Sequence, residues 1–171
     1  MRFLLDPYAG RQIRQVKLVK KKILVLGLGN PLMADEGVGC RIIERFLAQA
    51  DKFPAVDFID AGTGGLSILH LLAGRNKVVI IDCAYMDLSP GTIKRFTPDD
   101  VQSVKKLAHL SLHEVDIIKV IDLAKQLGQY PDEVIIFGVE PKIIEQRQNL
   151  SEVIIEKLDD YIAVISAELK S

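Results

Sequence analysis

The chain has 171 residues, of which 49% are hydrophobic, and its 22 basic and 23 acidic residues give a net charge of −1. This length and apolar content suit one folded domain with a buried core and exclude a disordered protein. The even charge balance gives no electrostatic reason to expect a nucleic acid or an anionic membrane as a partner.

The sequence also bears on the cellular compartment. No apolar run reaches the roughly 18 residues that a membrane-spanning helix needs, and Asp6 ends the short apolar stretch near the N-terminus. The two cysteines, Cys40 and Cys83, are too few for a disulfide framework and indicate reduced thiols. We therefore expect a cytoplasmic protein.

Residues 1–20 differ from the rest of the chain. They carry five basic residues against the single acid Asp6, without a regular period. We interpret them as a basic N-terminal extension and expect a single α/β domain over residues 21–171.

From residue 22 onward, short apolar runs alternate with helical patterns. Residues 22–27 form a continuous apolar run that ends in glycine, which is typical of a buried parallel strand. The spacing of Ser111 and Glu114 is that of a capping box at a helix start. Further strands are predicted at 55–60, 77–82, 92–96 and 133–139, and helices at 36–50, 66–73, 111–127 and 151–169.

This alternation predicts a three-layer α/β/α sandwich around a mostly parallel five-stranded sheet. The strand at 92–96 follows the one at 77–82 too closely for a parallel crossover, which takes about a dozen residues or more. It is therefore expected to run antiparallel to its neighbour, at a sheet edge.

Acidic residues stand where the predicted strands end. Glu36 follows the loop after the first strand, Asp60 ends the second strand and Asp82 ends the third. Ligands of open α/β sheets bind beyond the carboxyl ends of the strands, where the strand order reverses. If the second strand lies outside the first, the first and third strands flank this point, and Glu36 and Asp82 face each other across one crevice.

Purely structural roles are open for some of these acids. Asp35, which precedes Glu36, could cap its helix, and Asp60 could accept a hydrogen bond from the glycine-rich turn at 62–65. Asp82 directly follows the apolar run 78–81, where burying a carboxylate is costly unless it finds a partner.

His113 is a further candidate. The capping box places it in the first turn of its helix, from where its side chain can reach a neighbouring cleft; alone it would be an ordinary surface histidine. Together with Glu36 and Asp82 it gives two oxygen ligands and one nitrogen ligand, which suit a divalent first-row metal. This set does not choose between nickel, zinc, iron and manganese.

Other common chemistries lack their motifs. In the segment 27–32 a leucine takes the place of the last glycine of the dinucleotide-binding pattern G-x-G-x-x-G. Neither the nucleophile elbow G-x-S-x-G nor the zinc-protease motif H-E-x-x-H occurs.

Five segments resemble, in order and in spacing, the signature motifs of the hydrogenase maturation endopeptidases. They are residues 23–39, 60–65, 81–84, 111–113 and 137–141. Members of this family bind a metal ion, which stands for the nickel of the substrate, through a glutamate, an aspartate and a histidine. Matched by motif, these ligands are Glu36, Asp82 and His113, and other divalent ions can substitute for nickel.

The resemblance also implies an activity. It implies a protease domain of phosphorylase/hydrolase-like fold over residues 21–171, an endopeptidase that removes the C-terminal extension of a [NiFe] hydrogenase large-subunit precursor once nickel is inserted. The precursor is then the expected partner of a monomeric enzyme. Asp35 and Asp60 become candidates for the catalytic acid or base.

Two other functions compete with this one. A non-catalytic nickel-binding assembly chaperone could use the same three ligands without cutting the precursor. A peptidyl-tRNA hydrolase shares the opening Gly27-Leu28-Gly29-Asn30-Pro31, but Ala34-Asp35-Glu36 stands here in place of that family's basic segment. A nearly neutral protein is also poorly suited to grip tRNA phosphates.

Overall fold

The computed structural model describes residues 21–100 and 112–170, with side chains from residue 117 in the second range. The predicted basic extension at 1–20 and Ser111 of the predicted capping box lie outside the described residues. Within these ranges no helix is both long enough and apolar enough to cross a membrane.

A five-stranded sheet forms the middle of the molecule, with the strand order β2-β1-β3-β5-β4. Four strands are parallel, and β4 pairs with β5 in the antiparallel direction at one edge. The strands are β1 (Ile23–Gly27), β2 (Val56–Asp60), β3 (Lys77–Cys83), β4 (Ile93–Phe96) and β5 (Glu133–Val139). The predicted sheet is confirmed, including the antiparallel edge strand and the place of β2 outside β1.

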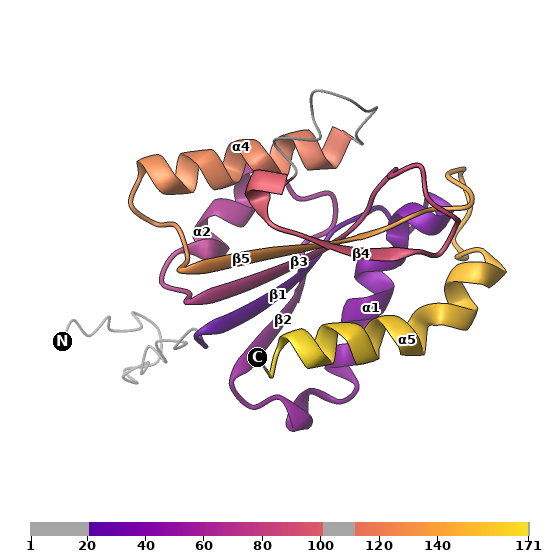
Figure 1. Ribbon diagram of the computed structural model, residues 1–171, viewed down its shortest axis with the longest axis horizontal. Helices are drawn as coiled ribbons and strands as arrows, with labels where there is room; N and C mark the ends of the chain where they lie inside the picture. The colour runs from indigo at the N-terminus through magenta and orange to yellow at the C-terminus, as the bar shows by residue number, and fades with distance from the viewer. Residues whose placement is uncertain (1–20, 101–111, 171) are drawn as a thin grey trace, which may run out of the picture.

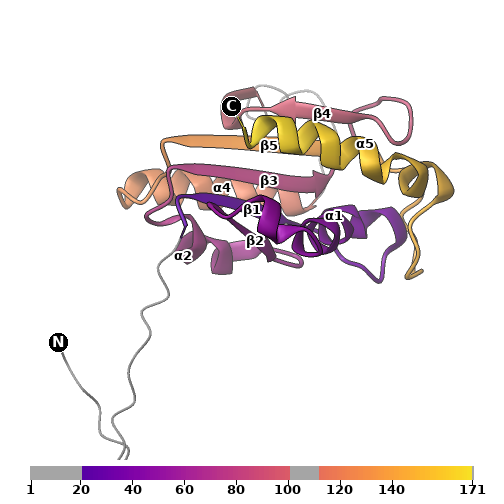
Figure 2. The same ribbon diagram turned by 90° about the horizontal axis from the view of Figure 1, so that it is seen from below.

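Helices cover both faces of the sheet and complete the three layers. Figures 1 and 2 show α1 (Val38–Leu47) and α5 (Glu152–Glu168) on one face, with α2 (Leu69–Leu72) and α4 (Leu112–Gln126) on the other. The predicted α/β/α sandwich is therefore confirmed.

Two predicted helices differ from the observed ones. The pattern at 36–50 becomes a 3-10 turn, η1 (Ala34–Gly37), then α1 and a second 3-10 turn, η2 (Ala50–Lys52). The pattern at 66–73 begins as a 3-10 turn, η3 (Gly65–Ile68), and only the four residues of α2 are α-helical. Tight 3-10 turns are common where a strand-to-helix connection is short.

Each face of the sheet has its own apolar core. On the α1 and α5 side, the rings of Phe46 and Phe58 stack with centroids 4.8 Å apart, and Phe53 packs edge-on against both. On the α2 and α4 side, Ile68 and Ile121 are fully buried among the residues of β1 and β3 that face these two helices. Since the central strands are covered on both faces, their sequences are continuously apolar.

Gly39 allows α1 to pack directly on the ends of β1 and β3. A Cβ atom at this position would lie 2.2 Å from the carbonyl oxygen of Leu28 and 2.6 Å from that of Ile81. Only a residue without a side chain fits here, so the first turn of α1 is held against the carboxyl end of the sheet.

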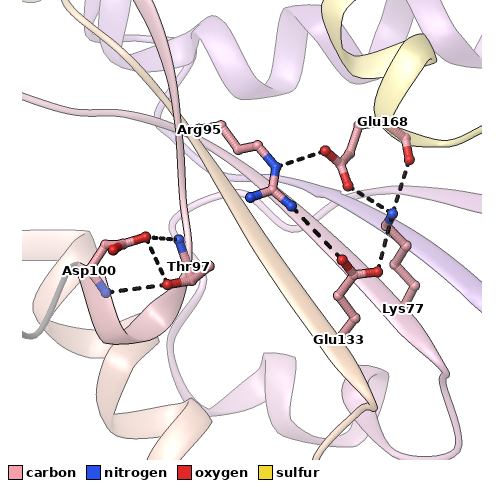
Figure 3. Close-up of polar contacts among 6 residues, drawn as sticks. All are labelled: Lys77, Arg95, Thr97, Asp100, Glu133 and Glu168. Carbon is pink, nitrogen blue, oxygen red and sulfur yellow. Dashed lines mark hydrogen bonds and ion pairs between the residues drawn. The ribbon is translucent and has the colours of Figure 1, made fainter. Parts of the chain in front are cut away.

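A cluster of ion pairs lies at the opposite, amino-terminal end of the sheet (Figure 3). Lys77 Nζ lies 2.7 Å from Glu168 Oε1 and 3.2 Å from Glu133 Oε2, and Arg95 donates to Glu168 at 2.8 Å. Burial favours a higher pKa for Glu168, but the hydrogen bonds and charges of Arg95 and Lys77 outweigh it and lower the pKa. These contacts fix the end of α5 to strands β3, β4 and β5.

Candidate active site

The loops that follow β1 and β2 meet beside β3 at the carboxyl end of the sheet. Leu28 N–H donates to the carbonyl of Ile81, and Gly29 N–H donates to that of Gly62, both at 2.8 Å. Because β1 lies between β2 and β3, the strand order reverses between β1 and β3. This is the strand order that the prediction of a ligand crevice between β1 and β3 required.

Glu36 lies in η1, which packs beside β3, and its side chain is half-buried. The loop that carries it folds back tightly over Gly29, whose φ is +132°. A Cβ atom on Gly29 would lie 1.8 Å from the carbonyl oxygen of Glu36. The glycine of the first sequence motif therefore determines where Glu36 sits.

Asp82 is the next-to-last residue of β3 and pairs in register with Gly138 of β5. It is only 3% exposed, and its Oδ1 accepts a hydrogen bond from the backbone N–H of Cys83 at 2.8 Å. A buried carboxylate at a strand end next to the crevice is unusual for a purely structural position.

Acidic groups gather around this end of β3, and the pKa of Tyr85 reflects them. Burial is the first cause that raises the pKa of the Tyr85 phenol, and the nearby groups Cys83, Glu140, Glu36 and Asp35 add to it. Glu36 and the residues next to Asp82 therefore share one electrostatic environment.

His113 is the second residue of α4, so its predicted place in the first helical turn is confirmed. Figure 1 shows α4 running from the side of the carboxyl ends back towards the start of β5. The His113 side chain lies outside the described residues, and no three His, Cys, Asp or Glu side chains within the described part are arranged to hold a metal ion. The full set of Glu36, Asp82 and His113 thus stays a prediction.

Asp60 ends β2 with an exposed side chain. Its Oδ1 accepts a hydrogen bond from Gly62 N–H at 2.9 Å, which confirms the predicted contact with the glycine-rich turn. Burial, followed by the hydrogen bond and charge of Asp60, raises the pKa of the Cys40 thiol to about 12. Cys40 is therefore an inert, packed thiol, and Asp60 keeps an accessible carboxylate near the crevice.

Asp35 is fully buried, and the suggestion that it caps its own helix is wrong. It lies inside η1, whose N-cap makes no side-chain hydrogen bond. Its Oδ2 accepts hydrogen bonds from Lys142 N–H, Ile143 N–H and the hydroxyl of Ser151, and its Oδ1 accepts one from Ser151 N–H. The carboxylate thus holds a distant segment that the local sequence did not indicate.

Glu140 is a buried acid that the motif analysis did not single out. It is 5% exposed, and its Oε2 accepts hydrogen bonds from Met86 N–H at 2.6 Å and Leu88 N–H at 3.3 Å. The sequence did carry a signal for this acid. Glu140 directly follows the buried strand β5, and Asp82 likewise lies near the end of the buried strand β3.

A groove also lies between α1 and α5, away from these acids. It contains none of the predicted site residues and is lined by Arg41, Glu44, Arg45, Asn149, Leu150, Ile155 and Leu158. The chemistry of the chain is concentrated at the carboxyl end of the sheet rather than in this groove.

Relatives of known sequence share most of the chain. The sequence is 33% identical over 123 residues to the hydrogenase expression/formation protein HoxM of Cupriavidus necator, covering 72% of this chain and 61% of that protein. It is 33% identical over 153 residues to HupD of Rhodobacter capsulatus, covering 88% and 72%. The chain spans 54% to 61% of the length of three such relatives.

Solved structures and a family profile agree with these matches. The fold is similar to the hydrogenase maturating endopeptidase HybD from E. coli, with a TM-score of 0.77, 26% identity, and coverage of 87% of this chain and 92% of that one. A hydrogenase 2 maturation peptidase from a Thaumarchaeota archaeon gives a TM-score of 0.66 and 27% identity, covering 88% and 99%. The profile of the HycI hydrogenase maturation proteases matches residues 40–168. The chain belongs to the hydrogenase maturation protease family.

Proposed function

We propose that this protein is an endopeptidase that removes the C-terminal extension of a [NiFe] hydrogenase large-subunit precursor after nickel insertion. The observation that carries the proposal is the position of Glu36 and Asp82, on adjacent elements at the carboxyl end of β1 and β3 in a member of this protease family. Solved relatives are named as [NiFe] hydrogenase maturation proteases, which supports the class of substrate.

In this proposal Glu36, Asp82 and His113 contact the nickel of the precursor. Two carboxylates and an imidazole suit a divalent first-row metal, and other divalent ions can take its place. The metal belongs to the substrate, so the three side chains distinguish a precursor that contains nickel from one that does not. Their grip then fixes one peptide bond relative to the protease, which lowers the entropic part of the barrier.

Asp60 is the accessible candidate for the catalytic acid or base. Its carboxylate is exposed at the end of β2, next to the loop that leads to Glu36. Asp35 was the other candidate, but both its oxygens already accept hydrogen bonds in a fully buried position. A group that must exchange protons with water or substrate needs access to them, which favours Asp60.

The proposed setting is a cytoplasmic monomer that meets the folded precursor. Both cysteines are buried and neither forms a disulfide, which fits a reducing compartment.

Mass spectrometry of a nickel-loaded and a nickel-free precursor, each incubated with the protein, tests the proposal. We expect loss of a C-terminal peptide from the loaded form only. If the loaded precursor binds but keeps its full mass, the protein is a nickel-binding assembly chaperone and the proposed activity is wrong.

A further inference from the structure

Residues 140–151, which connect β5 to α5, contact both the turn that carries Glu36 and the loop that follows Asp82. We call this segment the bridging loop. Its ends are buried, with Glu140 5% and Ser151 3% exposed, whereas residues 145–149 are exposed. Figure 1 shows it beside the β3–β4 connection and the region that precedes α1.

The first end of the bridging loop holds the loop that follows Asp82. Glu140 Oε2 accepts hydrogen bonds from Met86 N–H and Leu88 N–H. The backbone of Glu140 is also paired, since its carbonyl accepts from Gly91 N–H at 2.8 Å and its N–H donates to a carbonyl of the same loop at 2.9 Å. The chain directly beyond Asp82 is therefore tied to this one glutamate.

The second part of the bridging loop is held by Asp35, the neighbour of Glu36. The Asp35 carboxylate accepts hydrogen bonds from Lys142 N–H at 2.9 Å, Ile143 N–H at 3.0 Å and the Ser151 hydroxyl at 2.8 Å. Ser151 N–H donates to its other oxygen at 2.6 Å. Four donors around one buried carboxylate leave it a single orientation.

Backbone pairing strengthens the same contact. Ala34 N–H donates to the carbonyl of Arg147 at 2.6 Å, and Arg147 N–H donates to that of Leu32 at 2.9 Å. Asp35 N–H donates to the carbonyl of Ile143 at 3.2 Å. The chain just before Glu36 thus lies against the bridging loop in a strand-like pairing.

We infer that the bridging loop sets the spacing between Asp82 and Glu36. Its Glu140 holds the loop that follows Asp82, and Asp35, the neighbour of Glu36, holds its other end. Both buried acids are then positioning residues rather than catalytic ones. The inference rests on the proposed function, in which Glu36 and Asp82 contact nickel. A metal site gains from ligands that are fixed before the ion arrives, and small displacements of such groups are costly.

Geometry and charge can be separated at Glu140. Both backbone donors share its Oε2, so the amide oxygen of a glutamine can accept the same two hydrogen bonds. A positioning role needs only that acceptor, whereas an acid, base or metal ligand needs the carboxylate. Glu140→Gln therefore keeps the first contact, and Glu140→Ala removes it.

The experiment compares wild type, Glu140→Gln and Glu140→Ala by hydrogen exchange of the free protein and by cleavage of nickel-loaded precursor. In Glu140→Ala we expect faster exchange in the peptide over residues 84–92. We also expect a kcat lowered by about 100-fold, the cost typical of a misplacement of about 1 Å, with KM changed less than twofold. In Glu140→Gln both quantities return to within about twofold of wild type.

Two further variants make the comparison sharp. Glu145→Ala is the matched control, because Glu145 lies in the same loop but its side chain is 56% exposed and pairs with Arg147 at 3.6 Å. It is expected to behave as wild type. Ser151→Ala removes one of the four donors to Asp35, so a smaller loss of kcat is expected even if Glu140→Ala does not fold.

The outcomes distinguish the inference from the proposed function. If Glu140→Ala cleaves as wild type, or if folded Glu140→Gln is as inactive as Glu140→Ala, the inference is overturned. If wild type fails to cleave loaded precursor, the proposed function fails by itself. Exchange over residues 84–92 that is unchanged in Glu140→Ala overturns the inference even then.

Discussion

Asp35 accepts two hydrogen bonds from Ser151, a residue 116 positions further along the chain, one from its backbone N–H at 2.6 Å and one from its hydroxyl at 2.8 Å. Ser151 directly precedes α5, so the carboxylate lies at the N-terminus of that helix. A negative charge is favourable there because the first backbone N–H groups of a helix point outward. This contact connects the turn before Glu36 to the last helix of the fold.

Ser151→Ala is therefore expected to lower the free energy of unfolding by about 2 kcal/mol, the usual contribution of a hydrogen bond to a charged group. Urea denaturation followed by circular dichroism measures the change. Ser89→Ala is the control, since Ser89 is exposed in the β3–β4 connection, and it should change stability by less than about 0.5 kcal/mol. Equal effects of the two changes would contradict the role of the Asp35 contact.

Removal of any one proposed nickel ligand should weaken divalent-ion binding. Calorimetric titration with nickel is expected to show one site in wild type and a loss of affinity of at least about tenfold in Glu36→Gln, Asp82→Asn or His113→Ala. Asp132→Asn is the control, because Asp132 is exposed next to the start of β5, at the opposite end of the sheet. Tight binding that survives all three changes would falsify the ligand assignment.

The ion-pair cluster of Figure 3 predicts a dependence of stability on pH. The pKa of Glu168 is below its usual value of 4.5, because its hydrogen bonds and charge partners outweigh burial. Its contribution is present above pH 4.5 and is lost as the pH falls through the lower pKa of the folded state. Glu168→Gln should cost about 2 kcal/mol at pH 7, with the difference from wild type shrinking in acid. Denaturation curves between about pH 3 and about pH 7, which lie below and above the usual value of 4.5, check this. A difference that stays constant would contradict it.

Cys40 is expected to resist alkylation in the folded protein. Burial and then Asp60 raise the pKa of its thiol from 9.0 to about 12, so the reactive thiolate is scarce near neutral pH. Because the unfolded chain loses this proton at a lower pH, stability should decline as the pH rises from 9.0 towards 12. Iodoacetamide labelling followed by peptide mapping should modify Cys40 in urea but not in the native state. Rapid native labelling would show that the thiol is exposed.

Gly39→Ala should destabilise the protein by about 3 kcal/mol, because its Cβ would overlap the carbonyl oxygens of Leu28 and Ile81. Gly128→Ala is a useful comparison. Beyond its chain neighbours, no atom of the described residues lies within 4 Å of a Cβ there, and its φ of +64° adds backbone strain of about 1 kcal/mol. Thermal unfolding of the two variants separates close packing from strain, and a smaller effect at Gly39 would contradict the packing argument.

Sequence patterns predicted the sheet well because the burial of each strand is visible in its own residues. The continuous apolar runs of β1, β3 and β5 reflect burial on both faces, and the short connection before β4 leaves only an antiparallel course. The helix starts were less predictable. Glycines at 37, 39, 64 and 65 permit tight turns there, and close approach of the backbone is not visible in a periodicity.

Only those acids of the candidate site that lie at strand ends could be predicted from the sequence. Asp60 and Asp82 were found because they end strands, and their common edge follows from the strand order. The roles of Asp35 and Glu140 depend on partners about 50 to over 100 residues away, such as Leu88 and Ser151. Contacts at such separations leave no local pattern in a single sequence.

The antiparallel strand β4 also affects how the protein behaves in a crowded solution. Among the described residues, one side of β4 has no neighbouring strand in the sheet, and an open strand edge is a template for pairing with another chain. The strand is only four residues long, and its two middle residues, Lys94 and Arg95, are exposed cations. Arg95 is paired with Glu168, so a second copy approaching along this edge would meet the charge of Lys94 and a strand with few backbone groups to pair. Both features oppose the formation of intermolecular sheets.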